Sequence, residues 1–285
     1  MSEKKLIINA DDFGISNAVN RAVLKGWTDG ILTSASLMVT GEAFAEAAEI
    51  ARQNPALQVG LHLTLVQGRS ALKHTGFPSL TDHPGNFPED PVFAGMRMFF
   101  LKPLKKQLEK EIEAQIVRFL DTGLPLSHID GHLNIHMHPT VFDILCRLMP
   151  KYNISSFRLS RENLRAELSI SSTRALGKCV DAFIFSSLAK RCLPHLQNRR
   201  ISFASEVRGL LNSGRITEEY LLKSLGTLKE GTTEIYFHPS ESDSQDLPGY
   251  RQKDELEALV SQKVIDMIRS KSIKLCNYRG ETKDV

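Results

Sequence analysis

Residues 6–14 read Leu-Ile-Ile-Asn-Ala-Asp-Asp-Phe-Gly, an apolar run that ends in two adjacent carboxylates. The run predicts a short β-strand, and the polar residues directly after it predict the carboxyl end of that strand. A plain turn or helix entry would also explain Asp and Gly at this point. Neighbouring side chains of a strand point to opposite faces, so the backbone must bend if Asp11 and Asp12 are to reach one site.

Strand-like and helix-like segments alternate along the rest of the chain. We expect further strands at 31–39, 57–65, 126–136, 156–159, 234–238 and 273–276. We expect helices at 16–30, 41–53, 104–120, from Pro139 onward, at 217–229 and at 252–270. Such repeated units predict an α/β fold with parallel strands and outer helices, although pattern alone does not separate a barrel from an open sheet.

Two stretches do not fit this alternation. Residues 66–103 are rich in proline and glycine and predict a lid-like loop. Residues 161–204 carry many basic positions and predict an irregular insertion. A single α/β barrel routinely reaches this length, so we expect one domain over residues 1–285 that includes both stretches.

Composition excludes several classes of protein. The chain has 41% hydrophobic and 24% charged residues and a formal charge of +3, as in ordinary globular proteins. Nucleic-acid binding usually needs a denser basic stripe, so it is not expected. No apolar run reaches the length of about 20 residues that spans a bilayer, and the start resembles no secretory leader. We therefore expect a cytoplasmic protein; contact with a membrane surface and assembly into a homodimer stay open.

Polar residues recur where the predicted strands end. They are Asp11, Asp12, His62, the segment from His128 to His132, Arg158 and His238. Parallel α/β folds build their sites at the carboxyl ends of the strands, where the loops converge. The recurrence therefore predicts one site assembled from distant parts of the chain.

The strongest local pattern is Ser-His-Ile-Asp-Gly-His-Leu-Asn-Ile-His-Met-His at 127–138. In an extended strand His128, Asp130, His132 and His136 would share one face, which is costly to bury unless it lines a wet cavity or holds a metal. A surface strand of histidines is the plainer alternative. A rise of about 3.3 Å per residue would hold His128 and His132 roughly 13 Å apart, so both cannot bind one ion. We prefer His132, near the strand end, as the ligand.

One carboxylate and two histidines form a ligand set that leaves positions open for water and substrate. The acidic pair offers one carboxylate as ligand and the other as proton acceptor. His62 offers the third ligand, although a lone histidine in an apolar strand is often a core residue. Zn²⁺ suits these ligands, and oxygen-rich surroundings would permit Mg²⁺. His238 is a candidate acid or substrate contact, Arg158 a candidate anion or hydroxyl binder, and Tyr278 with Arg279 a weaker candidate pair.

These residues resemble the YdjC-like family of carbohydrate deacetylases, which includes chitooligosaccharide deacetylases and hopanoid-biosynthesis-associated HpnK proteins. The resemblance covers nearly the whole chain. It depends on Asn9–Gly14, Gly60-Leu-His62, His128–His132 with His136, His238-Pro239 and Tyr278-Arg279. Where some members have further histidines after the position of His132, this chain has Leu133 and Asn134.

The resemblance implies a distorted (β/α) TIM-like barrel that removes acetyl groups from N-acetylated sugars with one divalent ion. It implies that Asp12, His62 and His132 are ligands, that Asp11 is the base, and that His238 is an acid or substrate contact. His128, Asp130 and His136 are then second-shell or substrate-binding residues. The basic 161–204 segment is most similar to the hopanoid-associated branch, which implies a glycolipid substrate.

Two other functions remain open from the residues alone. A metal-dependent phosphoesterase would use the same ligand types, and a sugar- or lipid-binding protein would keep the site without turnover. Release of acetate or of phosphate, with and without a chelator, separates these functions.

Overall fold

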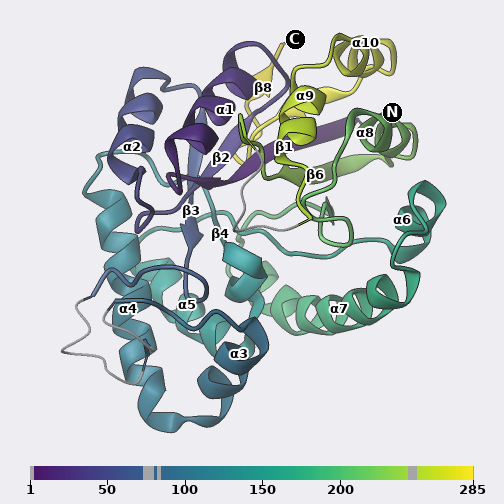
Figure 1. Ribbon diagram of the computed structural model, residues 1–285. Coiled ribbons are helices and arrows are strands. Elements are labelled where there is room, and N and C mark those ends of the chain that lie inside the picture. The colour runs from purple at the N-terminus through teal and green to yellow at the C-terminus, as the bar shows by residue number, and fades with distance from the viewer. Residues whose placement is uncertain (1–2, 73–79, 82–84, 243–248, 285) are drawn as a thin grey trace.

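The computed structural model describes residues 3–72, 80–81, 85–242 and 249–284. Central strands are surrounded by helices (Figure 1). The strands are β1 (Lys4–Phe13), β2 (Ser34–Leu37), β3 (Gln58–Leu63), β4 (Ile129–Gly131), β5 (Glu206–Arg208), β6 (Gly231–Phe237), β7 (Lys274–Cys276) and β8 (Thr282–Lys283). The helices are α1 (Asn17–Thr28), α2 (Phe44–Gln53), α3 (Pro91–Phe100), α4 (Lys102–Leu120), the 3-10 helix η2 (His132–Met137), α5 (Pro139–Lys151), α6 (Leu164–Ile170), α7 (Ala175–Asn198), α8 (Glu218–Gly226), α9 (Gln252–Leu259) and α10 (Gln262–Ser270).

The strands close into a distorted barrel. They pair in the order β4-β3-β2-β1-β6-β5, and every pair in this order is parallel. Outside the named strands, Ile129 of β4 forms a parallel bridge with Phe157, and Ser156 forms another with Ser202, just before β5. These bridges join the two ends of the order. The predicted α/β barrel is therefore confirmed, with its weakest pairing between β4 and β5.

β1 is the longest strand and the centre of the sheet. Its early residues Lys5 and Leu6 pair with β7, and its later residues pair with β2. Between the pairs Ala10–Ala35 and Phe13–Leu37 the register shifts, because β1 contributes one more residue than β2. Asp11 and Asp12 lie within this bulge, which provides the bend that two adjacent carboxylates need to reach one site.

Local chemistry explains where several helices begin. Ser16 caps α1 by accepting from the Val19 amide, as its sequence position predicts. Asp90 caps α3 by accepting from the Val92 and Phe93 amides, and Pro91 fits the first turn because its missing N–H costs nothing there. Ser261 caps α10, and so the predicted continuous helix 252–270 is two helices.

Three other expectations were wrong in part. The strand predicted at 126–136 ends at Gly131, because the chain turns there into η2 with left-handed backbone at Leu133 and Asn134. The stretch 66–103 contains α3 and the start of α4; parts of the predicted lid, 73–79 and 82–84, lie outside the described residues. The 161–204 segment is mostly helical, in α6 and α7. These helices were missed because many of their apolar residues are exposed, so the apolar positions do not repeat with the spacing of a helix that packs on a core.

Among the described residues, no helix is both long and apolar enough to cross a membrane. The exposed apolar side chains of α3 and α7 lie on helices too polar or too short for that.

Candidate metal centre

Asp12 has an unusual backbone and an unpartnered oxygen. Its φ is 61°, in the left-handed region, and its carboxylate is 2% exposed. Left-handed backbone is uncommon for residues other than glycine and is often found at functional sites. Oδ1 contacts two histidines, but the buried Oδ2 has no hydrogen-bond partner in the described structure. A buried carboxylate oxygen in this state is costly unless a cation or proton occupies the space beside it.

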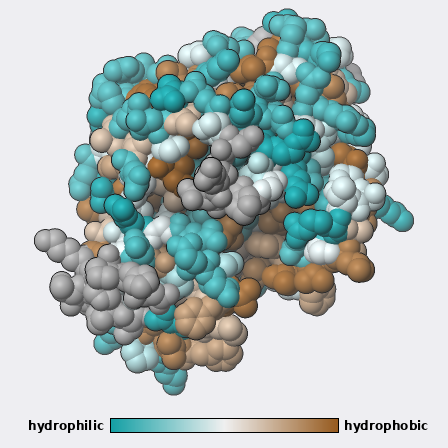
Figure 2. Space-filling model, in the orientation of Figure 1, coloured by the Kyte–Doolittle hydropathy of each residue, from teal (hydrophilic) through white to brown (hydrophobic). Residues whose placement is uncertain are grey.

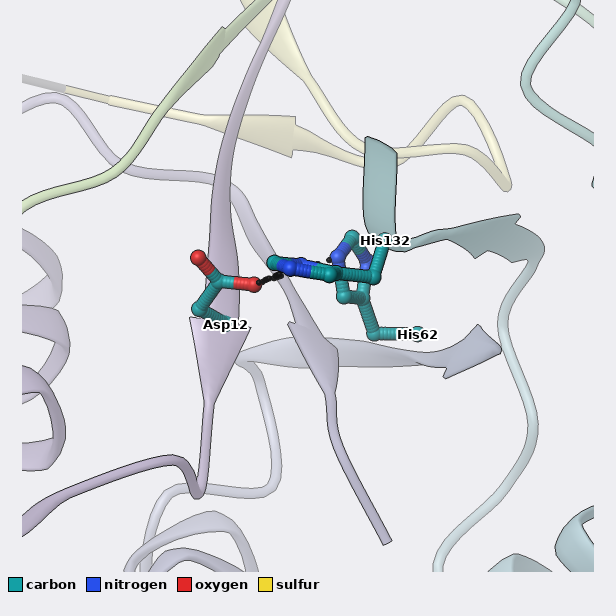
Figure 3. Close-up of side chains that lie close together, drawn as sticks. All are labelled: Asp12, His62 and His132. Atoms are coloured by element: carbon teal, nitrogen blue, oxygen red, sulfur yellow. Dashed lines mark hydrogen bonds and ion pairs between the residues drawn. The ribbon is translucent and has the colours of Figure 1, made fainter. Parts of the chain in front are cut away.

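His62 of β3 and His132, directly after β4, converge on this carboxylate (Figure 3). Asp12 Oδ1 lies 2.9 Å from His132 Nδ1 and 3.3 Å from His62 Nε2. All three side chains are buried, and their ligand atoms lie within 4.8 Å of one another. Burial alone would raise the pKa of Asp12, but His132 and His62 hold that pKa well below its usual value.

The other ring nitrogen of His62 is held by a carboxylate. His62 Nδ1 donates to Asp130 Oδ1 at 2.8 Å, which leaves Nε2 directed at Asp12. This carboxylate–histidine pair is the arrangement that fixes the tautomer of metal-binding histidines. Burial would lower the pKa of His62, but Asp130 and Asp11 raise it to about 10. Asp130 therefore orients the His62 ring so that Nε2 faces Asp12.

Arg158 connects three carboxylates beneath the cluster. Its guanidinium donates to both oxygens of Asp11 at 2.7 Å, to Glu234 at 2.6 Å, and lies 2.8 Å from Asp130 Oδ2. It is fully buried, with its guanidinium carbon 4.5 Å from the centre of the Tyr236 ring. Arg158 therefore contacts the carboxylates behind the cluster and does not line the cleft.

In the part of the chain that the structure describes, two groups of side chains have the spacing of a cation site: Asp12 with His62 and His132, and Asp11 with His62 and Asp130. The second group has its carboxylates engaged by the Arg158 guanidinium, which would repel a metal ion. The first group contains the unpartnered oxygen of Asp12. The residues of the first group therefore fit a divalent cation, with one oxygen and two nitrogen donors.

His128 is a buried structural residue. Its ring stacks on Tyr278 with centroids 3.7 Å apart, and its nitrogens contact the hydroxyls of Ser127 and Ser36. Burial lowers the pKa of His128 to about 3, so it is neutral near pH 7. Gly60 leaves room for this ring, because a Cβ there would lie 2.4 Å from His128 Cε1.

His136 and His238 are buried, whereas Arg279 is exposed. His136 is fully buried, contacts the Arg158 carbonyl at 2.9 Å through Nε2, and has a pKa lowered by burial to about 4. His238 follows β6, and burial also lowers its pKa. Its Nδ1 has no partner among the described residues, and its ring packs beside Tyr236 and Tyr250. Arg279 is exposed at the C-terminal side.

A cleft of about 710 Å³ opens on Asp12 and His132. Its wall includes the polar side chains of Glu42, Arg69 and Gln252 beside apolar ones such as Ile15 and Met38. A volume in the range of small-molecule sites, with polar groups among apolar ones, suits a ligand that carries hydroxyl groups on a carbon ring.

Comparison with known proteins now identifies the family. The model of the family described as YdjC-like protein matches residues 5–270. The chain belongs to the YdjC-like family. A carbohydrate deacetylase of Thermoanaerobacter pseudethanolicus is 30% identical over 96% of this chain and 98% of its own length. A carbohydrate deacetylase of Vibrio cholerae is 29% identical over 96% of this chain and 95% of its own.

A solved structure supports the same fold for this YdjC-like protein. An Enterococcus faecalis protein, whose name refers to cellobiose-phosphate cleavage, is 29% identical and has a TM-score of 0.76. The likeness covers 99% of this chain and 100% of the Enterococcus faecalis protein. The barrel is therefore a fold that this chain shares with a solved relative.

Sequence reasoning missed several residues that hold the site of this YdjC-like protein. Asn9 Nδ2 donates to Asp11 and to Ser36, and Ser36 donates to Asp130. Glu234 holds Arg158, and Glu255 accepts from the His238 amide at 2.5 Å. Glu234 lies in an apolar run, and this position could have predicted a buried ion pair, because a buried charge needs a partner. Glu255 on a surface-like helix gave no such signal.

Proposed function

We propose that this chain is a sugar deacetylase that hydrolyses the N-acetyl group of an N-acetylglucosamine-type sugar with one divalent ion. The substrate would be an oligosaccharide or a glycolipid, including one linked to a hopanoid. The observation that carries the proposal is the buried Asp12–His62–His132 cluster with its unpartnered Asp12 oxygen. Full-length relatives named carbohydrate deacetylase support the chemistry.

In this proposal Asp12, His62 and His132 hold the ion. When bound, a divalent ion polarises the acetamide carbonyl and lowers the pKa of a nearby water. Zn²⁺ and Mg²⁺ are the two candidate ions. Asp130 keeps the proton of His62 on Nδ1 and so leaves Nε2 for the ion.

Asp11 is the proposed base. Arg158 donates to both of its oxygens and Asn9 to one, which fixes the direction of the carboxylate. In this role Asp11 accepts a proton from the attacking water. His238 is the proposed acid that donates a proton to the leaving amine nitrogen. Burial lowers the pKa of His238, which makes its protonated ring a stronger acid.

The test is acetate release from N-acetylglucosamine, short N-acetylated oligosaccharides and N-acetylated glycolipids, beside a matched set of phosphate esters. Each is assayed before chelation, after chelation, and after separate restoration of Zn²⁺ or Mg²⁺. We expect acetate release that chelation stops and one ion restores. Phosphate release would favour a phosphoesterase. Sugar binding that survives metal removal, without acetate release, would favour a non-catalytic binding protein.

A further inference from the structure

α3 presents a row of apolar side chains to solvent. Phe100 is 72% exposed and Val92 is 67% exposed. The exposed apolar side chains of this helix and its end are Val92, Phe93, Met96, Phe99, Phe100 and Leu101. Their spacing of three to four residues places them on one helical face. This face has no covering element in the described structure, although large apolar side chains usually find one.

α7 presents a second apolar row. Leu176 is 86% exposed and Phe183 is 76% exposed, with Val180 and Ile184 beside them. The buried apolar residues of α7, Ala189, Cys192 and Leu196, are all in its C-terminal half. The N-terminal half of α7 lies at the edge of the molecule (Figure 1), and its apolar side chains named above are exposed there.

The chain that follows His132 of the candidate site contacts both helices. Leu133 of η2 directly follows His132 and is 38% exposed. His138, at the end of η2, packs against Phe99 of α3 with ring centroids 6.3 Å apart. On its other side η2 contacts α7. Figure 2 shows apolar colouring along the same lower edge, over α3 and α7. We call the α3 row, Leu133 and the α7 row the apolar edge.

Cations flank the apolar edge. Lys102, Lys105 and Lys106 are exposed directly after α3, and exposed Arg174 precedes α7. Three acidic residues lie nearby: exposed Glu89 and Asp90 at the start of α3, and Asp181 on α7, against the four cations named. Apolar side chains bordered by lysine and arginine are the composition of surfaces that bind anionic lipid bilayers. A second copy of the same surface would instead bring like charges together.

We propose that the apolar edge seats the protein on an anionic lipid bilayer, with the cleft facing the sugars of glycolipids in that bilayer. This inference deepens the proposed function and rests on it for the identity of the substrate. Binding to the bilayer involves only α3, η2 and α7, so it does not depend on which substrate the site takes. Because Leu133 directly follows His132 in the chain, the apolar edge begins one residue from the metal cluster.

The test is flotation of the metal-loaded protein with vesicles of phosphatidylglycerol and phosphatidylethanolamine, beside vesicles of phosphatidylcholine alone. We expect binding to the anionic vesicles that weakens at high salt. The double substitution Phe100→Glu with Phe183→Glu should reduce vesicle affinity by about a hundredfold, because two large apolar side chains no longer leave water. The matched control is Val117→Glu, at a 39% exposed apolar residue of α4 outside the apolar edge.

A second readout separates this inference from the proposed function. Acetate release from a short soluble N-acetylated oligosaccharide should be unchanged in the double variant, while release from a glycolipid in vesicles falls with its binding. Equal flotation of wild type and double variant, or equal binding to both kinds of vesicle, would overturn the inference. A wild-type dimer in light scattering that the double variant dissociates would also overturn it, in favour of an interface between copies.

Discussion

Arg158 donates to both carboxylate oxygens of Asp11, each at a distance of 2.7 Å. The same guanidinium also holds Asp130, which orients His62, and Glu234 at the back of the barrel. One buried cation therefore fixes the proposed base and, through Asp130, one of the proposed ligands. Such a bidentate contact sets the direction of a carboxylate as well as its charge.

Arg158→Lys should lower kcat at least about tenfold while KM stays unchanged, because an ammonium cannot hold both Asp11 oxygens in one plane. Arg158→Met should lower the free energy of unfolding by about 3–5 kcal/mol, since it leaves buried carboxylates without their cation. Urea unfolding and steady-state kinetics measure both effects. A lysine variant with wild-type kcat would contradict the positioning role.

Gly60 is predicted to be indispensable for packing. Gly60→Ala should lower the free energy of unfolding by about 1–3 kcal/mol, because the added Cβ would lie 2.4 Å from His128 Cε1. Gly226→Ala is the control, because Gly226 is exposed at the end of α8 and an added Cβ there would lie 3.9 Å from Met267 Cε. The control should be neutral or stabilising by up to about 1 kcal/mol. Equal effects of the two substitutions in urea unfolding would exclude this account of Gly60.

His128 predicts a dependence of stability on pH. Its pKa is about 3 in the folded protein and 6.5 ordinarily, so the unfolded chain binds more protons between these values. Stability is therefore fully present above pH 6.5 and is lost as pH falls toward 3, by up to about 1.4 kcal/mol per pH unit from this residue. His136 acts in the same direction. In urea unfolding from pH 7 to 4, His128→Phe should show a shallower slope; an unchanged slope would count against a buried neutral His128.

His238→Gln should lower kcat for an N-acetylated sugar by about 10²–10⁴-fold, because the amine leaves poorly without a proton. For 4-nitrophenyl acetate, whose leaving group needs no proton, the loss should be far smaller. Metal content, measured on the same sample, should stay at the wild-type level. A similar loss with both substrates would remove His238 from the role of acid.

The sequence predicted those parts of the site that depend on strand ends. Asp11, Asp12, His62 and His238 follow or end runs of apolar residues, and parallel topology brings such positions to one edge. The requirement for a bend at Asp11–Asp12 follows from side-chain alternation alone, and the bulge in β1 provides it. Of the two histidines, His132, which we prefer as the ligand, is the one that contacts Asp12.

The sequence did not predict what depends on contacts between distant segments. The histidine pattern after Gly131 suggests an extended strand, but Leu133 and Asn134 adopt left-handed backbone and turn the chain into η2. His136 therefore packs behind the site on the Arg158 carbonyl and not beside His132. The role of Arg158 depends on Glu234 and Asp11, both far from it in sequence. The contacts of this network form only when the barrel closes, so no local sequence pattern predicts them.

The most direct test compares Asp11→Asn with Asp12→Asn, two isosteric substitutions at adjacent buried carboxylates. Metal content and acetate release from an N-acetylated oligosaccharide are measured on the same preparations, with folding checked by urea unfolding. The account predicts that Asp11→Asn keeps about one ion per chain but loses turnover by about 10²-fold or more, whereas Asp12→Asn loses the ion as well. Full metal content in Asp12→Asn, or wild-type turnover in Asp11→Asn, would contradict it.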